Sequence, residues 1–156
     1  MPRVRTSIHT GLVSPELAAA AFSYALANID WIQLRTRTSK RWAATFPMAV
    51  LVAHEPIQLI VVAVCAALDI PYTQLPSIWL NLYRDGNDST PSHKHDSRQV
   101  IISLGATRRL QVASKSYALA SGDVAVFGSS VHSVPIQPEV SNERISIALF
   151  IPNTDT

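Results

Sequence analysis

The chain has 156 residues, of which 47% are hydrophobic, and a formal net charge of only +2 at pH 7. This length suits one domain with a single core, and the small net charge excludes a polycation. The only cysteine, Cys65, excludes an internal disulfide and a cysteine-based zinc cluster. Because no apolar run is long enough to span a bilayer and no signal peptide is expected, we predict a soluble, intracellular protein without a membrane partner.

Two helices are predicted in the first half of the chain. The first has Ser14 as N-cap and Pro15 in its first turn, and it runs to about Asn28. The second is expected at about residues 56–68. Residues 31–46 between them are irregular or strand-like, with several arginines and aromatic residues.

Short strands separated by turn signals are predicted in the second half. Helices followed by a run of short strands indicate an α+β chain whose β part is a sandwich or barrel. The predicted strands are residues 78–83, 100–104, 110–113, 124–127 and 145–151.

Three of the five histidines fall in this β half, and their placement predicts a metal site. His93 and His95 are two residues apart, so on a strand both side chains project from the same face. His132 follows the predicted strand 124–127 and would supply a third ligand while other coordination positions stay open. A His-x-His pair in a polar loop is more often solvated than bound to metal, so the neighbouring motifs decide between the two interpretations.

Five motifs follow one another from Asn81 onward. Asn81 and Tyr83 lie on a predicted strand, and a turn containing glycine and aspartate leads from it to His93. A serine-leucine-glycine run, a strand leading to His132, and a strand beginning at Arg144 come next. The motifs occupy residues 81–93, 101–108, 122–128, 132–135 and 144–150. In this order they resemble the AlkB-like branch of the iron(II)- and 2-oxoglutarate-dependent oxygenases.

The resemblance implies a double-stranded β-helix, or jelly roll, with flanking N-terminal helices. It implies one domain over residues 1–156, with helices and a substrate-recognition lid in about 1–75 and the jelly-roll core in about 76–152. The implied cofactors are Fe(II) and 2-oxoglutarate, with His93 and His132 as iron ligands. The implied cosubstrate-binding residues are Asn81, Tyr83, Arg144 and Ser146, of which Arg144 pairs with a carboxylate.

Two positions depart from the family pattern. The family has aspartate where this chain has His95, and an acid follows one place later as Asp96. Strand alternation favours His95 as the third ligand, whereas a β-bulge would bring Asp96 into its place. The family also has a second arginine at the position of Phe150, and Arg108 or Arg109 is the candidate to replace its charge.

The first half is expected to choose the substrate. Arg37 and Arg41 offer charges for phosphates, and Trp42 offers a stacking surface, although Trp42 is equally compatible with a core or hinge position. The resemblance thus implies oxidative demethylation or hydroxylation of a modified nucleobase, extruded from DNA or RNA. The alternatives are a small-molecule 2-oxoglutarate oxygenase and a non-catalytic nucleic-acid-binding descendant of the family.

Overall fold

The computed structural model describes residues 4–153, so the first and last three positions of the predicted domain lie outside the described residues. Two antiparallel sheets lie against each other, with strand orders β1-β9-β6-β11-β4-β3-β2 and β5-β10-β7-β8. This is the predicted α+β double-stranded β-helix. The strands are β1 (Ser7–His9), β2 (Ile32–Arg35), β3 (Lys40–Pro47), β4 (Ser77–Tyr83), β5 (Thr90–His93), β6 (Ser97–Gly105), β7 (Arg108–Val112), β8 (Lys115–Leu119), β9 (Val124–Phe127), β10 (His132–Val134) and β11 (Arg144–Pro152).

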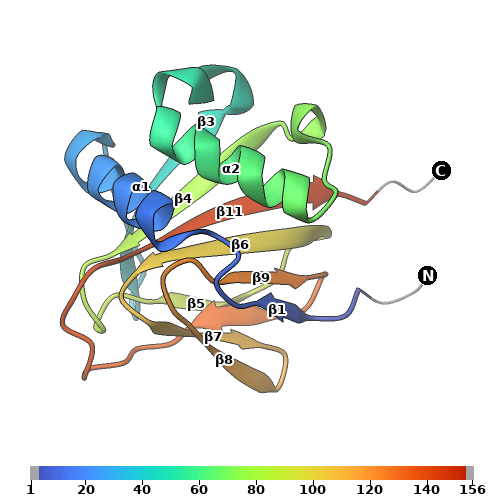
Figure 1. Ribbon diagram of the computed structural model, residues 1–156. Coiled ribbons are helices and arrows are strands. Elements are labelled where there is room, and N and C mark those ends of the chain that lie inside the picture. Colours follow the sequence, from blue (N-terminus) through green and yellow to red (C-terminus); the bar gives the residue numbers. More distant parts are fainter. Residues whose placement is uncertain (1–3, 154–156) are drawn as a thin grey trace.

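Two α-helices, α1 (Pro15–Asn28) and α2 (Glu55–Ala67), cover the outer face of the large sheet (Figure 1). The hydroxyl of Ser14 accepts a hydrogen bond from the Leu17 amide at 3.2 Å and caps α1, as predicted. Two short 3₁₀ helices, η1 (Met48–Ala53) and η2 (Tyr72–Gln74), flank α2. Within residues 4–153, no helix is both long and apolar enough to cross a membrane.

Alternate residues of the central strands β4 and β11 point to opposite faces of the large sheet. One face is apolar and packs against the helices; the other faces the small sheet. The helix-facing residues of these two strands are Ile78, Leu80, Leu82, Ile145, Ile147 and Leu149. Apart from Ala148, the positions between them carry polar or aromatic residues, so the inner face is free to carry a site.

Several strands were not predicted from the sequence. The short strands β5 and β10 of the small sheet belong to this group, and so do β1 and β8. β5 contains Pro91, and β10 has only three residues, so neither has a run of alternating apolar residues to mark it. These strands form because their partners in the sheet supply the hydrogen bonds.

The turn between β4 and β5 packs closely against the loop that precedes β11. The Gly86 amide donates to the Val140 carbonyl at 2.7 Å, and the Gln137 amide donates to the Gly86 carbonyl at 2.8 Å. A Cβ atom on Gly86 would collide with the Gln137 carbonyl oxygen. Glycine is therefore required here for close backbone approach.

We predict that Gly86→Ala lowers the free energy of unfolding by about 1–3 kcal/mol, because the added methyl group forces the two loops apart. Urea denaturation followed by circular dichroism measures this change. Asn87→Ala, at the exposed neighbouring position, is the matched control and should stay within about 0.5 kcal/mol of the wild type. Equal stability of the two variants would show that the turn does not need its glycine.

Candidate metal and cosubstrate site

The structure brings the three predicted histidines together. His93 ends β5 and lies directly opposite His132 at the start of β10, with ring centroids 4.2 Å apart. The His95 ring centroid lies 4.9 Å from that of His93 and 5.7 Å from that of His132. The three potential ligand nitrogens lie within 4.8 Å of one another. Three nitrogens that share one metal at about 2.1 Å lie about 3.0–3.6 Å apart, so the most separated pair must approach by no more than about 1–2 Å for all three to coordinate one ion.

Backbone carbonyls orient two of these rings. Nδ1 of His93 lies 2.8 Å from the Pro91 carbonyl oxygen, and Nδ1 of His132 lies 2.9 Å from that of Ser130. Because a carbonyl only accepts, each Nδ1 carries the proton, and each Nε2 keeps its lone pair for a metal. Burial lowers the pKa of His132 to about 4, and burial and then His93 lower the pKa of His95. His132 is therefore neutral at pH 7, which is the form that binds metal.

His95 reaches the group by a different route from the one predicted. β5 ends at His93, so His95 belongs to the connection to β6 and its position does not follow from strand alternation. Its ring packs edge-on against Phe150, with centroids 4.8 Å apart. Asp96 is exposed, and its carboxylate accepts a hydrogen bond from the Asn153 amide at 3.5 Å. The structure thus places His95, and not Asp96, beside the other two histidines.

A cavity of about 560 Å³ lies between the two sheets, and the three histidines line it. Within the described part of the chain, no aspartate or glutamate lines this cavity. The inner face of the large sheet supplies the four predicted cosubstrate residues, Asn81, Tyr83, Arg144 and Ser146. An acid-free cavity that contains a buried arginine is suited to an anionic ligand.

Arg144 is a buried cation with unused hydrogen-bond donors. Its side chain is only 1% exposed, and its Nε donates to the Ser103 hydroxyl at 2.9 Å. Both Nη atoms are buried and have no hydrogen-bond partner among residues 4–153. Burial lowers its pKa to about 10, so the guanidinium is still protonated at neutral pH. Because an unpaired buried charge is costly, this arrangement fits a ligand that brings a carboxylate to the two Nη groups.

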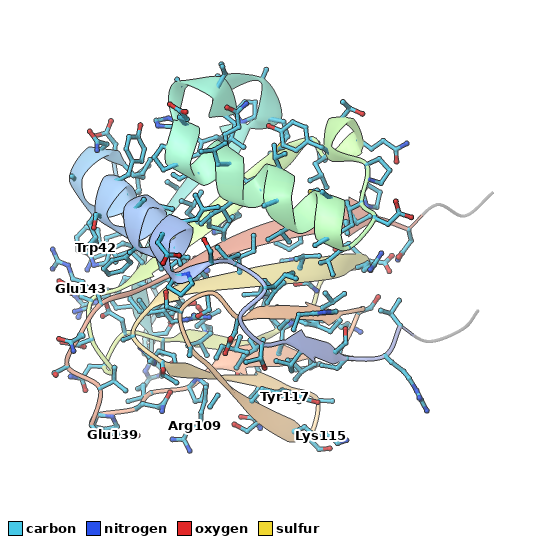
Figure 2. All side chains as sticks on the ribbon, in the orientation of Figure 1. Trp42, Arg109, Lys115, Tyr117, Glu139 and Glu143 are labelled. Atoms are coloured by element: carbon cyan, nitrogen blue, oxygen red, sulfur yellow. The ribbon has the colours of Figure 1, made fainter. Side chains whose placement is uncertain are left out.

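Neither predicted replacement for the second family arginine reaches the cavity. Arg108 is wholly buried, and its Nη atoms donate to the carbonyls of Asp85, Asp88 and Pro135 at 2.7–2.9 Å. These bonds hold the segments before β5 and after β10, so Arg108 supports the two strands that carry histidines. Arg109 is exposed and projects outward (Figure 2). The expectation that either arginine replaces the missing charge is therefore wrong.

Of the three predicted substrate residues, only Arg41 lines the cavity. Its Nε donates to the Asn81 side-chain oxygen at 2.9 Å. Trp42 points to the opposite face of β3, where it packs against the helix-side core beneath the Arg84 guanidinium (Figure 2). Arg37 is exposed between β2 and β3. The helices also lie on that far face, so the part of the predicted lid that reaches the cavity is the β2–β3 hairpin.

Several cavity residues were missed in the sequence. Gln99 and Ser97 on β6 each bury a side-chain oxygen that has no partner within residues 4–153. The Thr90 hydroxyl lies 2.7 Å from that of Tyr83, and the Trp79 indole donates to Asn81 at 3.2 Å. Strand alternation from Asn81 would have indicated Trp79. Gln99 and Ser97 were missed because the predicted strand began at residue 100, three residues after the start of β6.

Comparison with known proteins identifies solved structures with the same fold. No protein-family profile matches the chain, and no curated protein sequence matches it. The non-heme alpha ketoglutarate dependent epimerase SnoN from nogalamycin biosynthesis aligns with a TM-score of 0.69 at 10% identity, over 97% of this chain and 83% of SnoN. A second structure of SnoN contains Fe3+, alpha ketoglutarate and nogalamycin RO.

Two prolyl hydroxylases are similar in the same way. A Pseudomonas putida prolyl-4-hydroxylase aligns with a TM-score of 0.62 at 15% identity, over 96% of this chain and 94% of its own. The Trichoplax adhaerens prolyl hydroxylase, in complex with a hypoxia inducible factor peptide, gives 0.70 at 12% identity, over 93% and 82%. At these identities the likeness establishes the fold, and the chain has the double-stranded β-helix that these proteins share.

Proposed function

We propose that this chain is an iron(II)- and 2-oxoglutarate-dependent oxygenase that hydroxylates a small molecule. The observation that carries the proposal is the buried, unpaired Nη pair of Arg144 in the same cavity as three convergent histidines. The fold neighbours support the same class, because SnoN is described as alpha ketoglutarate dependent and has a structure with Fe3+ and alpha ketoglutarate.

Each site residue has a physical task in this proposal. His93, His132 and His95 hold the metal through ring nitrogens and leave part of its coordination sphere open. Arg144 binds the distal carboxylate of 2-oxoglutarate through its two Nη groups, with its Nε fixed by a hydroxyl. When bound, iron(II) and 2-oxoglutarate supply the oxidising power: substrate C–H, dioxygen and 2-oxoglutarate give the C–OH product, succinate and carbon dioxide.

The remaining lining residues exclude water from the reacting groups. Leu110, Val134, Ala148 and Phe150 give the cavity an apolar surface around the histidines. Apolar walls of this kind strengthen the electrostatic interactions inside the cavity and direct the oxidising chemistry to the substrate.

A nucleobase oxygenase is the second candidate function. The exposed Arg37 and the half-buried Lys40 favour it, because they belong to the β2–β3 hairpin, whose Leu34 and Arg41 line the cavity. Lys40 is however paired with Asp88 at 3.6 Å, and Trp42 points away from the cavity. Arg37→Ala should weaken binding of a single-stranded oligonucleotide, and reduce its salt dependence, only if this second candidate is correct.

We predict that His95→Ala lowers iron(II) affinity at least about 10-fold, because it removes one of three ligands. Anaerobic titration of iron(II) measures the affinity, and succinate release after oxygen is admitted measures turnover. Asp96→Ala is the matched control and should behave like the wild type. If Asp96→Ala loses the metal while His95→Ala keeps it, the third ligand is the carboxylate. Metal binding without any 2-oxoglutarate binding or turnover would indicate a non-catalytic descendant.

We predict that Arg144→Met weakens 2-oxoglutarate binding by roughly 10- to 100-fold, because a charge-assisted pair contributes about 1.5–3 kcal/mol. Methionine fills the buried site without a charge, so the variant should stay folded. Calorimetry on the anaerobic, iron-loaded protein gives the dissociation constant. Arg109→Met removes an exposed arginine outside the cavity and should leave it unchanged. Equal affinities for Arg144→Met and the wild type would contradict the assignment.

A further inference from the structure

We propose that Arg41 binds a carboxylate of the molecule that the enzyme oxidises, so that the substrate class is a small organic acid. This inference rests on the proposed function and adds a second anion-binding position to the cavity. Arg144 supplies the first position at the wholly buried end, whereas Arg41 is half-buried and lies on β3, in the β2–β3 hairpin at the edge of the large sheet.

Arg41 is held in place with its charge unneutralised. The Asn81 side-chain oxygen accepts from Arg41 Nε at 2.9 Å and from the Trp79 indole at 3.2 Å, so three neighbouring side chains fix one another. Within residues 4–153, Arg41 forms no ion pair, and its Nη groups donate no hydrogen bond. The guanidinium is thus positioned with its outer edge available, and that edge matches the two oxygens of a carboxylate.

The composition of the cavity indicates a small acid. Its volume of about 560 Å³ lies within the range of small-molecule sites, which is about 300–1,000 Å³. Leu34 from β2 and Trp79 from β4 give the lining near Arg41 an apolar and aromatic surface. An extruded nucleobase would bring no formal negative charge to an arginine inside the cavity, because its phosphates stay outside. A carboxylate on an apolar or aromatic body satisfies both the cation and these walls.

The test uses the whole protein loaded anaerobically with iron(II) and 2-oxoglutarate, so that no turnover occurs. Binding of 3-phenylpropanoate and hexanoate is compared by calorimetry with binding of the corresponding uncharged amides. We expect the better of the two acids to bind at least about 10-fold more tightly than its amide. Arg41→Gln should weaken binding of this acid roughly 10- to 100-fold and leave its amide unaffected, whereas Arg41→Lys should retain part of the preference.

Two controls separate this inference from the function on which it rests. Arg35→Gln removes a nearby exposed arginine of β2 and should keep the full preference for acids. The affinity of Arg41→Gln for 2-oxoglutarate should stay within about twofold of the wild type, because Arg144 is intact.

Each contrary outcome overturns a distinct statement. Absence of acid binding, or equal binding of acids and amides, would show that Arg41 does not bind a substrate carboxylate. Loss of 2-oxoglutarate from Arg41→Gln, as from Arg144→Met, would place Arg41 in the cosubstrate site and leave the proposed function standing. Failure of the wild type itself to bind 2-oxoglutarate would overturn the proposed function.

Discussion

The two-residue alternation of the large sheet is the constraint on which the site depends. The central strands are covered on one side by helices and face the small sheet on the other, so every second residue must be apolar. The alternating residues on the inner face need not be apolar. Asn81, Tyr83, Arg144 and Ser146 lie at such positions. In register, Arg144 lies beside Tyr83 and Ser146 beside Asn81, so two strands present four site residues as two neighbouring pairs.

The two buried arginines, Arg108 and Arg144, differ in how their hydrogen-bond donors are used. The Nη groups of Arg108 donate hydrogen bonds to three backbone carbonyls, and these bonds fix the segments that lead into β5 and out of β10. Arg144 donates to the protein only through Nε, and both of its Nη groups are without a hydrogen-bond partner among the described residues 4–153. The two guanidinium groups lie at the same distance, 5.3 Å, from the ring of Tyr83, which offers each an electron-rich face. The Nη groups of Arg108 are satisfied and hold the frame, although its buried Nε has no partner within residues 4–153. The two unpaired Nη groups of Arg144 instead suit an anion.

The sequence predicted what local patterns encode. The caps and spacing of α1, and the apolar runs of β4 and β11, depend on neighbours in the chain, and these elements lie close to where they were expected. β5 and β10 depend on pairing with each other, and β10 also on pairing with β7, so no local pattern marks them. For the same reason, the sequence could list Arg41 and Trp42 as candidates but not assign them to opposite faces, because the register of β3 was not predicted. His95 was chosen by a strand rule that does not apply at its position.

The two departures from the family motif, His95 and Phe150, are in contact with each other. In the motif that the sequence resembles, these positions carry an aspartate and an arginine, which are opposite charges. Here an imidazole and a phenyl ring pack edge to face at 4.8 Å. Replacing only the aspartate would leave an arginine beside three imidazoles without the protein's own negative charge at that position. Replacing both keeps the summed charge of the pair at zero, and in this chain the two positions are joined by an aromatic contact. With phenylalanine at residue 150, Arg144 is the arginine we propose for the cosubstrate carboxylate, because it is buried and lines the cavity.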